Sequence, residues 1–250
     1  MSSVELVPSL PWRENVHEYE PFKAKNEMKK IFTIALLAVF ATITASAQMY
    51  DDYVDGLRDT WQKTITVPNS QAPVVEKLLL AWGKEFPNEF MEIFDTYKKT
   101  GDTKNQGLYN YKVDYAPQNG FIEIYGSWSM IAEVDGNFAK GDTITREHIL
   151  QAVYWNLPNG NKLFGVSIEV DGEIFANCAV MFYEYNAAKG ALTPRADVVK
   201  RIYGKMGISN PPVGDETEIF IKLPKVGRDI KYNDYSSGSE KIIKWNGNGF

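Results

Sequence analysis

The chain has 250 residues, with 27 basic and 32 acidic side chains, two histidines and one cysteine. The net charge of −5 is interspersed without a basic block, which argues against nucleic acid as a partner and against docking on anionic lipid. A single cysteine excludes an intramolecular disulfide, and two histidines at distant positions exclude a multi-histidine metal site. We therefore name no cofactor, no metal ligand and no catalytic residue, and a non-catalytic protein is the preferred interpretation.

Residues 28–47 have the layout of a secretory signal peptide. Two lysines precede an apolar run from Ile31 to Thr44, and small residues follow at positions 45–47. The run is shorter than the roughly 20 apolar residues that a membrane span requires. We expect export to the periplasm or the extracellular space, with cleavage between Ala47 and Gln48 and no stable membrane span afterwards. A retained signal anchor is the alternative.

Residues 1–27 precede this signal and carry five glutamates and three prolines. Signal peptides begin with a short basic segment, so an acidic extension is unusual in this place. We interpret it as an upstream extension outside the mature protein, with Met28 as the true start; a long disordered leader is the alternative. The mature chain would run from Gln48 to Phe250, which suffices for one domain.

Residues 48–104 are predicted to be helical. Residues 51–63 form a first candidate helix, and Pro73 stands at the start of a second one with apolar side chains at helical spacing. A third follows the bend at residues 86–88 and ends at Gly101, a residue type suited to a helix C-cap. Each candidate has an apolar stripe that needs a partner surface, and the simplest partner is the sheet that follows.

From residue 105 to residue 250 the pattern predicts a β-rich domain with one short helix near 197–206. Tyrosine and valine alternate with polar residues from Tyr109 to Tyr115, which is typical of a half-buried strand. Asp-Gly pairs at 135–136 and 171–172 and the Pro-Asn-Gly-Asn stretch at 158–161 predict hairpin turns. The other candidate strands are Phe121–Met130, Ile149–Leu157, Leu163–Val170, Phe175–Tyr185, Thr217–Leu223, Ile230–Tyr235 and Lys241–Trp245.

The links between most strands are too short for parallel crossovers. The predicted fold class is therefore α+β, with the N-terminal helical segment packed on a mainly antiparallel, meander-like β-sheet of eight or nine strands that forms a partial barrel or sandwich. Cys178 lies in a strongly apolar strand, which predicts a buried thiol rather than a nucleophile.

Aromatic side chains are the candidate ligand-binding residues. Exposed aromatic faces bind sugars or apolar ligands, whereas buried ones fill the core and the cross-strand pairs. Adjacent residues in a strand point to opposite faces, so one of Tyr154 and Trp155 is expected to be exposed. The candidates are Tyr125, Trp128, Tyr154, Trp155, Tyr183 and Tyr185.

The alternative hypothesis, a hydrolase, depends on carboxylate side chains. A glycosidase needs two acids facing each other across a cleft, and Glu123, Glu169, Glu173 and Glu184 all lie in or beside predicted strands. Glu184 stands between two tyrosines, and a carboxylate in an apolar strand tends to have a raised pKa.

Three functions fit these patterns. The first is an exported, non-catalytic binding or interaction protein that uses an aromatic-rich sheet face, with a small molecule, a glycan or an envelope protein as its partner. The second is a secreted, glycosidase-like hydrolase with paired carboxylates. The third is a structural envelope component. A cavity with convergent carboxylates would favour the hydrolase, and an open aromatic patch would favour binding.

Overall fold

The computed structural model describes residues 53–54, 56–103, 105, 109–131, 143–171, 176–208, 219–234 and 238–250. The described residues all belong to one compact unit. The predicted signal peptide, its cleavage site and the extension before it lie outside the described residues. None of the helices in the described ranges is long and apolar enough to cross a membrane.

Two amphipathic helices follow the first helical residues at 53–54 and 56–60. Helix α2 (Val74–Glu85) starts directly after Pro73, as predicted. Helix α3 (Glu89–Thr100) starts at Asn88, whose side chain accepts a hydrogen bond from the Met91 amide at 3.1 Å, and ends at Gly101 with a left-handed φ of 72°.

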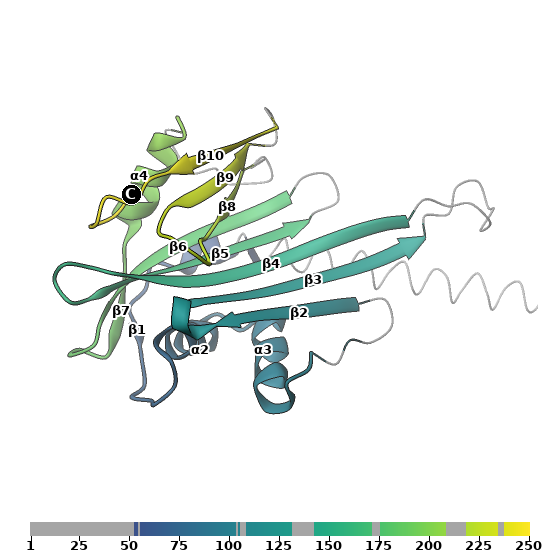
Figure 1. Ribbon diagram of the computed structural model, residues 1–250, viewed down its shortest axis with the longest axis horizontal. Coiled ribbons are helices and arrows are strands. Elements are labelled where there is room, and N and C mark those ends of the chain that lie inside the picture. Colours follow the sequence, from purple (N-terminus) through teal and green to yellow (C-terminus); the bar gives the residue numbers. More distant parts are fainter. Residues whose placement is uncertain are drawn as a thin grey trace, which may run out of the picture. The chain divides into compact units, whose positions relative to one another are not determined.

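A seven-stranded antiparallel sheet forms the centre of the fold (Figure 1). The strands run in spatial order β1-β7-β6-β5-β4-β3-β2, so strands β2 to β7 form an uninterrupted meander and β1 pairs with β7 at one edge. A 3₁₀ turn, η1 (Pro117–Asn119), connects β2 to β3. The strands are β1 (Ile65–Thr66), β2 (Tyr109–Ala116), β3 (Phe121–Ile131), β4 (Thr143–Asn156), β5 (Lys162–Asp171), β6 (Ala176–Asn186) and β7 (Ala191–Pro194).

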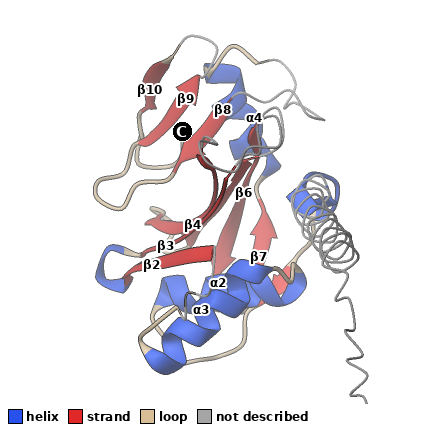
Figure 2. Ribbon diagram, turned by 90° about the vertical axis from the view of Figure 1, so that its right-hand side faces the viewer, coloured by secondary structure: helices blue, strands red, loops and turns tan. Residues whose placement is uncertain are grey.

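A three-stranded antiparallel sheet of β8 (Ile219–Lys222), β9 (Ile230–Asp234) and β10 (Ser239–Ile243) and helix α4 (Ala196–Lys205) complete the fold. Figure 2 shows three layers: α2 and α3 lie against one face of the large sheet, and the small sheet and α4 lie against the other. The α+β meander is confirmed, and the sheet is open rather than a closed barrel.

The face of the large sheet that carries Ile124 and Leu150, here called the helix face, packs against α2 and α3. Trp82 and Phe94 from these helices are fully buried there. Two tyrosines of β2 also bond across this interface, since the Tyr111 hydroxyl donates to Glu89 and the Tyr115 hydroxyl donates to Glu76. The interface is thus an apolar core with tyrosine–glutamate hydrogen bonds at its margin.

Side chains occupy individual backbone groups at the edges of the large sheet. On the outer side of β2, the Tyr111 amide donates to the Asn105 side chain at 2.6 Å, and the Thr103 hydroxyl donates to the Tyr111 carbonyl at 2.8 Å. Strand β7 covers only the last residues of β6. Beyond it, the Arg58 guanidinium donates to the carbonyl of Cys178 at 2.7 Å.

Two strands were not predicted from the sequence. The two-residue β1 falls within the segment expected to be helical, and β7 follows the Asn186–Gly190 turn directly. Both are short, and their pairing with each other across the chain is a tertiary contact that leaves no periodic signal. The Asp-Gly pair at 135–136 and Gly172 lie outside the described residues, whereas Asp171 ends β5 and pairs with Ala176. The strands on either side of each predicted turn are antiparallel neighbours.

Candidate functional site

A cavity of about 350 Å³ lies between the large sheet and the small sheet. It adjoins the face of the large sheet that carries Phe121 and Glu123, here called the cavity face. Strands β2, β3 and β4 provide one side, and β8, β9, β10 and the Leu223–Asp229 segment provide the other. The lining residues are Asp114, Phe121, Glu123, Gln151, Lys222, Leu223, Pro224, Lys225, Val226, Asp229, Lys231 and Glu240.

Three polar contacts fix the Leu223–Asp229 segment to the large sheet. The Leu223 amide donates to the Gln151 side-chain oxygen at 2.8 Å, and the Trp155 indole donates to the carbonyl of Arg228 at 2.9 Å. Lys225 forms an ion pair with Asp114 on β2. The Leu223–Asp229 segment is therefore held at both ends and in between, which fixes the shape of this side of the cavity.

Glu123 and Gln151 form the polar centre of the cavity face. They are cross-strand partners, and the Gln151 amide donates to Glu123 Oε2 at 2.6 Å. Gln151 is buried, so both ends of its side chain are used: the oxygen accepts from Leu223 while the nitrogen donates to Glu123. Asp114 lies directly opposite Glu123 on β2, which places two carboxylates on neighbouring strands in one cavity.

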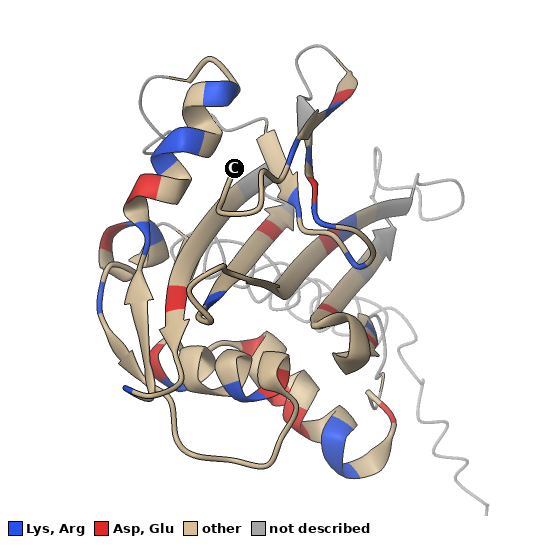
Figure 3. Ribbon diagram, turned by 60° about the vertical axis from the view of Figure 1, so that its left-hand side comes forward, with Lys and Arg blue, Asp and Glu red and all other residues tan. Residues whose placement is uncertain are grey.

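The remaining charges of the cavity come from the small sheet and the turn before it. A hydrogen bond from Lys231 to Glu240 at 2.7 Å lowers the pKa of that carboxyl. A hydrogen bond from Lys244, together with one from the Trp245 amide, lowers the pKa of Asp229. Both carboxylates are ionised at neutral pH. Figure 3 shows charges of both signs on the small sheet and on the neighbouring strands.

The predicted aromatic residues are split between the two faces of the sheet. Tyr125 lies on the cavity face, two residues beyond Glu123, where its hydroxyl donates to Glu147 at 2.6 Å and it stays half-buried. Tyr154 is half-buried on the helix face, with the Lys162 ammonium 4.7 Å from its ring. Among the candidates whose side chains the structure describes, Tyr125 and Tyr154 are the two that are partly exposed. The side chain of Trp128 is not among those described.

Three other aromatic candidates are buried. Tyr183 is fully buried, and its hydroxyl donates to the Trp61 carbonyl at 2.8 Å, while Tyr185 packs in the same core. Trp155 is buried under the C-terminal segment, stacked on Trp245 at 5.7 Å and packed edge-on against Phe250. The expected exposure of one member of the Tyr154–Trp155 pair is met only in part, because Trp155 is covered and Tyr154 is half-covered. The five candidates whose side chains the structure describes do not form a common patch.

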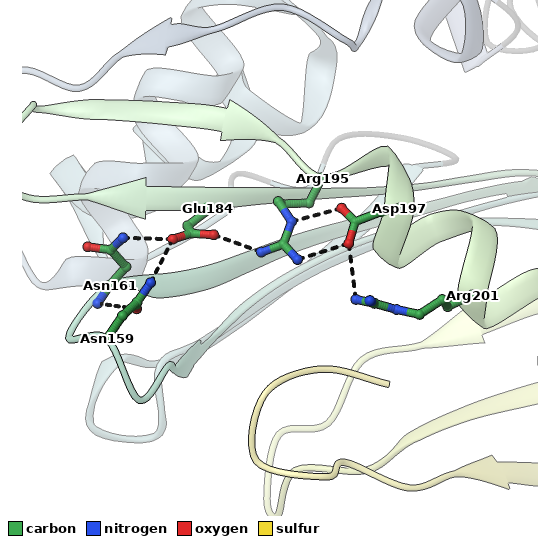
Figure 4. A network of polar contacts seen from close by, with 6 residues as sticks. All are labelled: Asn159, Asn161, Glu184, Arg195, Asp197 and Arg201. Carbon is green, nitrogen blue, oxygen red and sulfur yellow. Dashed lines mark hydrogen bonds and ion pairs between the residues drawn. The ribbon is translucent and has the colours of Figure 1, made fainter.

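Glu184 belongs to a polar network at the end of β6 (Figure 4). Its carboxylate accepts hydrogen bonds from Asn161 at 2.7 Å, from Asn159 at 3.1 Å and from Arg195 at 2.7 Å. These bonds lower the pKa of Glu184, so the expectation of a raised pKa is wrong. The tyrosines flanking it in sequence point to the opposite face, and they do not surround the carboxylate.

Arg195 links this network to helix α4. Its guanidinium donates to both carboxylate oxygens of Asp197 at 2.8 and 2.9 Å, and Arg201 reaches Asp197 from the next turn at 3.2 Å (Figure 4). This geometry ties the β4–β5 turn, β6 and the first turn of α4 together. All its described charges are paired, which indicates a structural role.

Cys178 and Glu169, which the sequence also singled out, lie outside the cavity lining. Cys178 is buried, and burial raises the pKa of its thiol, as expected of an inert cysteine. Glu169 faces Cys178 across β5 and β6, away from the cavity lining, and Glu173 lies outside the described residues. No group of three or more metal-ligating side chains occurs within the described ranges.

Comparisons with known proteins return no match: no protein-family model, no curated protein and no solved structure is significantly similar to this chain. The site therefore has to be interpreted from its own chemistry. Sequence reasoning named Glu123 as one of several strand carboxylates, but it missed Lys222, Lys231 and the Leu223–Asp229 wall. Alternation alone places Lys222 and Lys231 on one side of a strand pair; nothing in the sequence says which other strands they meet.

Proposed function

We propose that this chain is an exported, non-catalytic binding protein that takes a small, polar, hydroxylated molecule into the cavity between its two sheets. One observation carries the proposal: a cavity of about 350 Å³, in the size range of ligand sites, is lined by charged and amide side chains from both sheets. An apolar ligand would leave these groups desolvated without partners, which is costly. A ligand rich in hydroxyl groups would satisfy them.

The state of the carboxylates favours binding over hydrolysis. A glycosidase needs one carboxylic acid with a raised pKa to protonate the leaving group. Asp229 and Glu240 have lowered pKa values, and Asp114 is already paired with Lys225. The one observation that supports a hydrolase is the placement of Asp114 directly opposite Glu123 in the same cavity.

Export is the second part of the proposal, and it rests on the sequence of residues 28–47. Intact-mass measurement of the protein recovered outside the cytoplasm is expected to give an N-terminus at Gln48. A product that retains Met1 would contradict it.

Binding can be tested with glucose, glucosamine and glucuronate, followed by amide chemical shifts and calorimetry. We expect at least one of them to shift resonances of the cavity-lining residues. Glu123→Gln should weaken that binding, whereas Glu92→Gln on the exposed surface of α3 should not. Hydrolysis of an aryl glycoside that is lost in Glu123→Gln would replace the proposal by the hydrolase, and absence of any cavity shift would reject it.

A further inference from the structure

The small sheet presents two lysines side by side to the cavity. Lys222 on β8 and Lys231 on β9 are directly opposite each other in the strand register, and both line the cavity. Their neighbours Ile221 and Tyr232 point to the other side and belong to the core. Like charges directly opposite each other on neighbouring strands are destabilising, so the pair requires compensating negative charge.

The protein supplies only part of that compensation. Glu240 on β10 accepts a hydrogen bond from Lys231, and it acts on Lys222 only through space. Lys222 is half-buried, and its ammonium group forms no hydrogen bond or ion pair with the residues that the structure describes. Two ammonium groups thus share one carboxylate, which leaves about one positive charge on this wall.

The opposite wall offers a hydrogen-bond acceptor. Glu123 uses Oε2 to accept from Gln151, and its other oxygen receives no hydrogen bond from the described part of the chain. Asp114 beside it is neutralised by Lys225. The cavity therefore presents a cationic wall on the small sheet and a carboxylate acceptor on the large sheet.

We infer that the ligand carries a carboxylate that binds to Lys222 and Lys231, and a hydroxyl or amino group that donates to Glu123. This inference rests on the proposed function and specifies its ligand class as a small hydroxylated acid. One net positive charge on the wall matches the single charge of a carboxylate better than a phosphate monoester, which carries about −1.5 to −2 at neutral pH.

Glucose and glucuronate form a matched pair of probes, because they are similar in size and only glucuronate carries a carboxylate. We expect the full mature chain to bind glucuronate at least tenfold more tightly than glucose, with an affinity that falls as salt is added. Glucose 6-phosphate, the third probe, should bind more weakly than glucuronate.

Two variants with opposite expected effects on glucuronate affinity test the role of Lys222 and Lys231. Lys222→Gln should remove most of the preference for glucuronate over glucose, and it should fold normally because it relieves a like-charge contact. Glu240→Gln should raise glucuronate affinity several-fold, because the carboxylate that competes for the two lysines is gone. A merely structural role of Glu240 would give no increase. Lys99→Gln, on exposed α3, is the charge-matched control and should change nothing.

The outcomes separate the inference from the proposed function. Equal affinity for glucose and glucuronate, with both lost in Glu123→Gln, would overturn the inference and leave the binding function standing. Tighter binding of glucose 6-phosphate than of glucuronate would overturn the carboxylate assignment. Failure of every probe to shift a cavity resonance would overturn both.

Discussion

The two faces of the large sheet are covered by different elements and through different contacts. The helix face is closed by α2 and α3 with fully buried aromatic side chains, and the tyrosine–glutamate hydrogen bonds of Tyr111 and Tyr115 cross the interface. The cavity face is covered by the small sheet and the C-terminal segment, which bury apolar side chains such as Ile230 and Phe250 and add polar contacts, among them Gln151 to Leu223 and Trp155 to Arg228. The comparison teaches that both faces have an apolar core, and that the cavity face differs in the polar contacts that surround a charged cavity.

The largest effect should come from the helix face. Phe94→Ala removes a fully buried ring that packs against Tyr115 at 5.9 Å, and we expect a loss of about 3–5 kcal/mol of unfolding free energy. Urea unfolding gives this value. If the faces are independent, glucuronate affinity of the folded variant stays unchanged; a parallel loss of affinity would contradict the comparison.

His148, also on the helix face, should make stability depend on pH. Burial, with a smaller effect of Arg146, lowers its pKa to about 4, against about 6.5 in the unfolded chain. Between these values the unfolded chain binds a proton that the folded one does not. Stability therefore falls as pH drops from about 6.5 to 4, by up to about 3 kcal/mol.

His148→Gln is the matched variant, because a glutamine has no charge at any pH in this range. Urea midpoints measured from pH 7.5 to pH 4.5 should fall more steeply for the native protein than for the variant. Parallel curves would show that His148 is not the titrating group.

Gln151→Met addresses the cavity face. It leaves the buried Leu223 amide without its acceptor and Glu123 without its donor, at a cost of about 1–3 kcal/mol. Amide hydrogen exchange should increase first in β8, while β3 and β5 stay protected. Gln71→Met, at an exposed position, serves as the control. Uniform acceleration across both sheets would mean that the two faces unfold as one.

Glu184→Gln should have the smallest effect. The ion pair with Arg195 is partly exposed, so we expect a loss of about 1 kcal/mol or less at pH 7. Because the folded state lowers the pKa of Glu184, its contribution is present above about pH 4.5 and disappears as pH falls through the folded value. Thermal unfolding at pH 7 and pH 3 should show the difference shrinking, with cavity binding untouched at pH 7.

The fold was more predictable from the sequence than the site. Helix periodicity with Pro73 and Gly101 marked α2 and α3, and period-two alternation marked the long strands, since both signals are local. The cavity depends on contacts such as Lys225 with Asp114, which are 111 residues apart. The pKa of Glu184 was misjudged for the same reason, because its partners Asn161 and Arg195 come from neighbouring turns rather than from its own strand.

The side chains at the sheet edges have a consequence for how the protein behaves at high concentration. An unpaired strand edge is a template on which another chain can add a strand and start fibril growth. Asn105 and Thr103 occupy the backbone groups of Tyr111 on β2, and Arg58 occupies a carbonyl that β7 leaves open. These hydrogen bonds occupy backbone groups that an added strand would need, so they oppose the pairing of a second chain at these positions.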